Sequence, residues 1–143
     1  MAARYSRRDA LEAAVGAAAI GGLAALKAEA RPLGSSIGRP IVLYCDLVVD
    51  PKREGEMLSH FHDRFKPAGA KFPGYIDLKM LKLRSIIQGY HLPTGVNYRF
   101  QLTYQSEELR QRWIASKVHA ALWPGIEDTL LDKNFHVALF DEA

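Results

Sequence analysis

Residues 97–125, NYRFQLTYQSEELRQRWIASKVHAALWPG, decide the fold because their hydrophobic period changes in the middle. Aromatic and leucine side chains alternate with polar ones as far as Gln105, which predicts a strand with one apolar and one polar face. Ser106 is a favourable helix N-cap, and beyond it apolar residues recur at helical spacing. Pro124-Gly125 is expected to end or kink this helix. A two-faced strand therefore runs directly into an amphipathic helix.

Three further strands are expected from their apolar or β-branched content. They are Ile41–Val49, Tyr75–Arg84 and Phe135–Phe140. The first and last are apolar in both phases, which is typical of strands that are buried on both faces. In the second, the apolar residues change phase, which predicts a β-bulge near Met80.

A first helix is expected between the first two strands. Asp50-Pro51 reads as its N-cap and first residue. Leu58, Phe61 and Phe65, with Met57 alongside, form its buried stripe, and the helix is expected to end before Pro67-Ala68-Gly69. The order β-α-β-β-α-β predicts an α+β, ferredoxin-like fold.

This fold leaves one face of the sheet without helices, because two helices cover only one side of four strands. Two of the strands nevertheless look buried on both faces. A second copy of the same sheet is the simplest cover, so we expect a homodimer with facing sheets.

The first thirty residues differ from the rest. Ser6-Arg7-Arg8 precedes an apolar run rich in Ala and Gly, and Ala28-Glu29-Ala30 has the A-x-A form of a cleavage site. The segment resembles a bacterial twin-arginine (Tat) export signal. We therefore expect a signal peptide at 1–30, a linker at 31–40 and one domain at 41–143, exported to the periplasm or secreted. The alternatives are an amphipathic N-terminal helix and an uncleaved membrane anchor.

Composition excludes several classes of protein. The net charge of +3 comes without a cluster of basic and aromatic residues in the domain, which argues against nucleic-acid binding. The single cysteine, Cys45, cannot form an internal disulfide and lies in an apolar strand. His60 and His62 are two apart on a helix and point to different faces, so no metal site is expected.

Together, the element order, Pro73-Gly74-Tyr75 and the spacing Trp113-x-x-Ser116-x-x-His119 resemble the dimeric α/β-barrel superfamily. The nearest group is the antibiotic biosynthesis monooxygenase-like domain. That resemblance covers about residues 41–141 and implies a ligand pocket between sheet and helices in each subunit. Members include small monooxygenases that oxidise anthrones or quinols without metal or flavin, haem-degrading enzymes, and proteins without an assigned role.

Asp46 is the most informative polar residue, because a carboxylate in an apolar strand must be paired, hydrogen-bonded or neutral. One interpretation is a general base that takes a phenolic or benzylic proton from the substrate. The other is a structural partner for Arg99 or Lys79 on a neighbouring strand.

His119 is the second acid/base candidate, or a haem ligand if the pocket holds a tetrapyrrole; the alternative is a half-buried helix histidine. Four residues are candidates to line the pocket for a small aromatic substrate: Tyr44, Arg99, Trp113 and Trp123. For both tryptophans, core packing is the competing interpretation. His136, in the last strand, could reach a pocket but is not selected. The predicted function is a cofactor-independent monooxygenase; haem binding or degradation and a non-enzymatic binding barrel are the alternatives.

Overall fold

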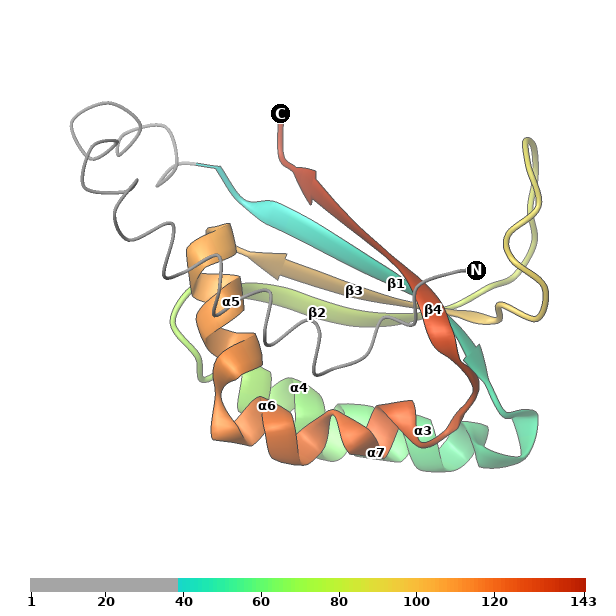
Figure 1. Cartoon of the computed structure of the whole chain (residues 1–143), viewed down its shortest axis with the longest axis horizontal. Helices are drawn as coiled ribbons and strands as arrows, with labels where there is room; N and C mark the ends of the chain where they lie inside the picture. Colours follow the sequence, from blue (N-terminus) through green and yellow to red (C-terminus); the bar gives the residue numbers. More distant parts are fainter. Residues whose placement is uncertain (1–38) are drawn as a thin grey trace.

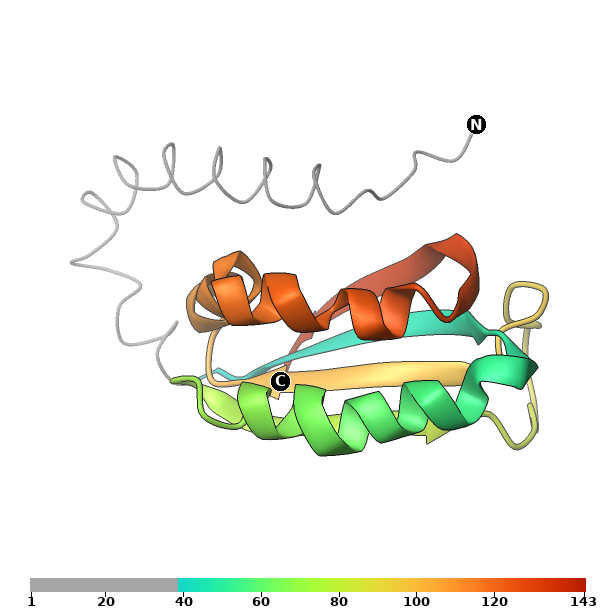
Figure 2. The ribbon, with the colours of Figure 1, turned by 90° about the horizontal axis from the view of Figure 1, so that it is seen from below.

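The computed structural model describes residues 39–143. The predicted signal peptide and most of the predicted linker lie outside these residues. Four strands form one antiparallel sheet in the order β2-β3-β1-β4. Their bounds are β1 Ile41–Val49, β2 Tyr75–Lys82, β3 Tyr98–Tyr104 and β4 Leu130–Asp141. Within the described residues, the helices cover one face of this sheet and leave the other open (Figures 1 and 2). This arrangement is the predicted α+β, ferredoxin-like fold.

The first helical layer continues through Pro67 instead of ending before it. It consists of η1 Pro51–Arg53, α3 Glu54–His60, η2 Phe61–Phe65 and α4 Lys66–Gly69. The segment η2 is a π-helical turn, in which the Lys66 N–H donates to the Phe61 carbonyl five residues earlier. This wider turn accommodates a proline that has no N–H and would clash with the carbonyl of an ordinary helical turn.

The second helical layer was predicted to be a single helix, but it is divided into three short ones. It consists of α5 Glu107–Ala115, α6 Lys117–Leu122 and α7 Pro124–Glu127. Ser106 caps α5 as expected, its Oγ accepting from the Leu109 N–H at 3.2 Å. Ser116 takes an extended conformation (φ −71°, ψ 151°) and caps α6 in turn. The predicted interruption at Pro124-Gly125 is confirmed, because α6 ends at Leu122. Pro124 then begins α7, since the first turn of a helix needs no N–H from that residue.

Two further details differ from the sequence-based expectation. The bulge in β2 lies at Ile76, between the pairs Tyr75–Tyr104 and Asp77–Thr103, and not near Met80. The last strand is longer than predicted, because it begins at Leu130. Leu130 pairs with Val49 across the β1–β4 ladder, so backbone pairing extends the strand beyond its apolar segment.

The core lies between the sheet and the helices. Residues 41, 43, 45, 47 and 49 of β1 and 98, 100, 102 and 104 of β3 point into it, as the alternation of β3 predicted. The helices contribute Met57, Phe61, Phe65, Trp113 and Trp123. Leu58, predicted to be part of the buried stripe, is only partly buried. Among residues 39–143, no helix is long and apolar enough to cross a membrane.

Candidate functional site on the open sheet face

Strand register places one row of side chains across the open face. Leu81 of β2 pairs with Arg99 of β3, Arg99 pairs with Asp46 of β1, and Asp46 pairs with His136 of β4. Directly paired residues of antiparallel strands have adjacent side chains on the same face. The row therefore brings a carboxylate, a guanidinium and an imidazole together from three strands.

Asp46 and Arg99 form a bidentate ion pair. Arg99 Nε donates to Asp46 Oδ1 at 2.7 Å, and Nη2 donates to Oδ2 at 3.1 Å. Only 6% of the Asp46 side chain is exposed, against 40% of the Arg99 side chain. The hydrogen bond to Asp46 raises the pKa of Arg99 further above its usual value. The structural alternative for Asp46, an ion pair with a neighbouring strand, is thus confirmed with Arg99 as the partner.

The Tyr44 ring makes a second contact with the Arg99 guanidinium. The Arg99 guanidinium carbon lies 5.0 Å from the centre of the Tyr44 ring, within range of a cation–π interaction. Phe140 packs edge-on against that ring, with 5.6 Å between the ring centres. The Asp46 carboxylate and the Tyr44 ring therefore both hold the Arg99 guanidinium, and its orientation is set before any ligand binds.

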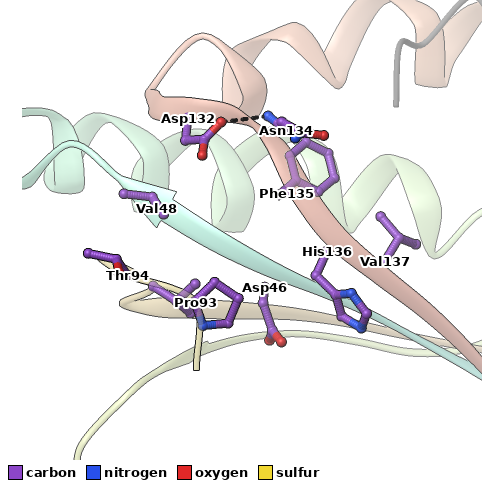
Figure 3. Close-up of a pocket in the computed structure, with 10 residues that line it drawn as sticks. Asp46, Val48, Pro93, Thr94, Asp132, Asn134, Phe135, His136 and Val137 are labelled. Atoms are coloured by element: carbon purple, nitrogen blue, oxygen red, sulfur yellow. Dashed lines mark hydrogen bonds between the residues drawn. The ribbon is translucent and has the colours of Figure 1, made fainter. Parts of the chain in front are cut away.

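Two hollows flank the ion pair. One, of about 300 Å³, has a mixed wall that includes the polar residues Asp46, Asp132, Asn134 and His136 beside apolar ones. Figure 3 shows Asp46 and His136 projecting toward this hollow from neighbouring strands. The other, of about 320 Å³, is walled by Asp46 and Arg99 together with apolar side chains that include Leu81, Leu92 and Val96. A ligand at Arg99 would thus have an apolar surface on one side and proton-exchanging groups on the other.

The segment between β2 and β3 overhangs both hollows. Its base is closed by the Leu83 N–H, which donates to the Asn97 carbonyl at 2.8 Å. The Asn97 side chain imitates a peptide group against the end of β1: Oδ1 accepts from the Val49 N–H, and Nδ2 donates to the Val49 carbonyl, both at 2.8 Å. These contacts position Pro93, Thr94 and Val96 beside Asp46.

The remaining predicted site residues lie on the other side of the sheet. The His119 ring stacks on Trp123 (9° between planes, centres 5.9 Å apart) and meets Trp113 edge-on at 5.2 Å. Phe65 packs against all three of these rings. Both tryptophans are buried in the core, which is the competing interpretation given above. The structure therefore unites Asp46, Tyr44 and Arg99 but separates them from His119, Trp113 and Trp123.

Two features of the surrounding chemistry are clear. Burial raises the pKa of the Cys45 thiol to about 12, which keeps it protonated and unreactive. Within the described part of the chain, no group of three or more His, Cys, Asp or Glu side chains could hold a metal ion.

His136 is the site residue that the sequence analysis did not select. Only the β1–β4 register, which pairs it with Asp46, singles it out from the other histidines.

Comparison with known proteins identifies the fold. No family model matches the sequence, and no curated protein matches it. Similar solved structures include a candidate antibiotic biosynthesis monooxygenase from Caulobacter crescentus, with TM-score 0.57 and 18% identity over 76% of this chain and 92% of that one. A second candidate antibiotic biosynthesis monooxygenase, from Bordetella bronchiseptica, has TM-score 0.56 and 12% identity over 73% and 97% of the chains. A dimeric ferredoxin-like protein of unknown function from Jannaschia has TM-score 0.56 and 11% identity over 74% and 99%.

Proposed function

We propose that this chain is a monooxygenase that uses dioxygen to oxidise a small aromatic substrate of the quinol or anthrone type without metal or flavin. We also propose that two copies assemble through their open sheet faces. The observation that carries the proposal is the Asp46–Arg99 ion pair between two hollows on that face. The fold, which is shared with candidate antibiotic biosynthesis monooxygenases, supports the reaction class. A facing sheet would exclude water from the hollows, which favours reactions of carbanions and phenolates.

Substrate binding falls to Arg99. Its Nε and Nη2 atoms donate to Asp46, so its Nη1 end is directed to an oxygen of the substrate. A developing phenolate or enolate oxygen there would be stabilised by a guanidinium that is already oriented. The aromatic rings of the substrate would lie against the apolar wall that includes Leu81 and Val96.

Proton transfer falls to His136 rather than to Asp46 or His119. Both carboxylate oxygens of Asp46 already accept hydrogen bonds from Arg99, which makes Asp46 a positioning residue for the guanidinium. His119 lies across the sheet, among core aromatic rings. His136 is exposed, lines the same hollow as Asp46, and belongs to the residue type that most often serves as a general base.

Dioxygen is the only co-reactant that the oxidation of an anthrone-type substrate needs. His136 takes one proton from the methylene carbon, and the resulting anion gives one electron to O₂. The radical pair combines to form a C–O bond and, after protonation, a hydroperoxide. Loss of the second methylene proton and cleavage of the O–O bond then give a carbonyl group and water. One oxygen atom ends in the product and one in water.

The test is oxygen uptake by the purified protein against a panel of anthrones and quinols, with a metal chelator present. We expect chelator-resistant uptake whose kcat falls by about 100-fold or more in His136→Gln. Arg99→Gln and Asp46→Asn should lower kcat as well, whereas the matched histidine variant His119→Gln should keep the kcat of the parent. Uptake that requires added metal, or that is equal in His136→Gln and the parent, would refute the mechanism.

Haem is the alternative cofactor, and the described residues do not favour it. Three aromatic rings pack against the His119 imidazole, the proposed axial ligand. A Soret band in the purified protein that disappears in His119→Gln would replace the monooxygenase proposal with tetrapyrrole binding.

Export through the Tat pathway is a separate proposal, supported by Arg7-Arg8 and the Ala28-Glu29-Ala30 cleavage pattern. N-terminal sequencing of protein recovered from the periplasm should begin at Arg31, and Arg7→Lys/Arg8→Lys should abolish its export. A chain that stays membrane-bound with Arg7 retained would instead support an uncleaved anchor.

A further inference from the structure

The overhanging segment 84–96, called the arm below, exposes large apolar side chains that the described residues 39–143 do not cover. Ile87 is 95% exposed and Tyr90 is 98% exposed. The arm is closed at its base by the Leu83–Asn97 hydrogen bond, and Gly89 turns it with φ +98°. Single exposed apolar residues are common, but two fully exposed ones at the tip of a closed arm indicate a contact surface.

The arm points to the open side of the sheet. In Figure 1 it rises from the end of the sheet where β2 leaves and β3 begins, away from the helical layer. Any molecule that packs on the open face at this end must therefore meet the arm.

The other end of the open face carries an exposed aromatic side chain, Phe140, which is available to the apolar arm of a second copy. Phe140 is 55% exposed and pairs with Val42, near the start of β1, whereas the arm lies beyond Val48. The six-residue step from Val42 to Val48 spans roughly 20 Å along the strand. The arm and Phe140 of one subunit are thus too far apart to contact each other.

We propose that the arm of each subunit packs on the Phe140 end of the open face of a second copy of this chain, with Ile87 and Tyr90 as the contact residues. This inference rests on the proposed dimer with facing sheets. A two-fold axis that lies between the sheets and crosses the strands exchanges their ends. Each arm then meets Phe140 of the partner subunit, and the same contact forms twice.

Charge on the open face is compatible with self-association. The register places Asp46 and Asp77 on this face together with Arg99 and Lys79. Each acid is already paired with a base, through Asp46–Arg99 and an Asp77–Lys79 contact of 3.3 Å. Two acids of this face are thus neutralised within their own subunit, although Asp132, paired with Val48, also lies on it. The arm of a second copy would also help to enclose the hollows beside Asp46.

Disulfide trapping tests the contact directly. The variant Tyr90→Cys/Phe140→Cys is oxidised and run on a non-reducing gel, after light scattering has established its mass. Cys45 can stay in place because its thiol is buried. We expect a covalent dimer in the double variant but not in either single variant. The control Tyr90→Cys/Val118→Cys, with its second thiol on α6 in the helical layer, should stay uncross-linked.

The outcomes separate the arm contact from the dimer itself. A mass of one subunit at all concentrations would refute the facing-sheet dimer and the arm contact with it. A stable dimer that does not cross-link, or that cross-links equally in the Val118 control, would refute the arm contact alone. Independently, Ile87→Ser/Tyr90→Ser should weaken the dimer at least tenfold in Kd and leave monomer unfolding unchanged, whereas Val118→Ser should leave Kd unchanged.

Discussion

Two glycines on neighbouring helices should respond oppositely to the same substitution. Gly125 lies in α7, and a Cβ added there would sit 2.3 Å from Cε1 and Nε2 of His60. Gly55 lies in α3, and a Cβ added there would meet nothing within 4 Å. Gly125→Ala therefore tests helix–helix packing, and Gly55→Ala reports helix propensity alone.

The size of the Gly125 effect follows from what His60 does. Its Nε2 lies 2.7 Å from the Leu122 carbonyl, which ties the first helical layer to the second. Because a normal carbon contact is about 3.5–4 Å, the ring must move by roughly 1 Å or more and give up this hydrogen bond. Overpacking costs about 1–3 kcal/mol and the lost hydrogen bond about 1 kcal/mol or more, against a helix-propensity gain of about 1 kcal/mol. The free energy of unfolding should fall by about 2 kcal/mol net.

Urea unfolding of the two variants and the parent measures these changes. Gly55→Ala should stabilise the protein by about 0.5–1 kcal/mol. The double variant His60→Ala/Gly125→Ala should be no less stable than His60→Ala, because removing the imidazole removes the clash. The packing argument would be refuted by a Gly125→Ala protein as stable as the parent, or by full additivity in the double variant.

The remaining predictions concern alkaline pH and the base of the arm. Because the Cys45 pKa is about 12 in the folded state against 9.0 ordinarily, its contribution to stability is complete below pH 9 and is lost as the pH rises toward 12. The loss is about 1.4 kcal/mol per pH unit. Urea titrations at about pH 8 and pH 10.5 should show it, and Cys45→Ala should lose less over the same interval; equal losses would contradict the assignment. Asn97→Ala removes both side-chain bonds to Val49 and should cost about 1–3 kcal/mol, with faster amide exchange at Val49. Asn134→Ala, exposed on β4, is the control and should stay within about 0.5 kcal/mol; equal costs at both positions would show that the peptide-like pairing contributes nothing.

The sequence by itself determined the element order and the faces of the strands. Alternation in β3 and the near-continuous apolar run of β1 identify the core-facing residues, because a strand side chain has only two directions. Ser106 and Asp50 mark helix starts through local hydrogen bonds, which depend on residues close in sequence. Sequence reasoning also singled out Asp46, because a buried carboxylate needs a cation on a neighbouring strand. It left Arg99 and Lys79 as possible partners, and the structure selects Arg99.

Only the tertiary structure decided where the helices bend and which site residues meet. At Pro67 the chain continues through a local breaking signal, because a π-helical turn accommodates the proline. At Ser116 the reverse holds, because the helix is interrupted where the sequence has no glycine or proline. His119 and Asp46 both look like acid/base groups in sequence, yet the sheet lies between them. His136 gains its significance from strand register, a long-range property, because the ladder between β1 and β4 and not any local motif places it opposite Asp46.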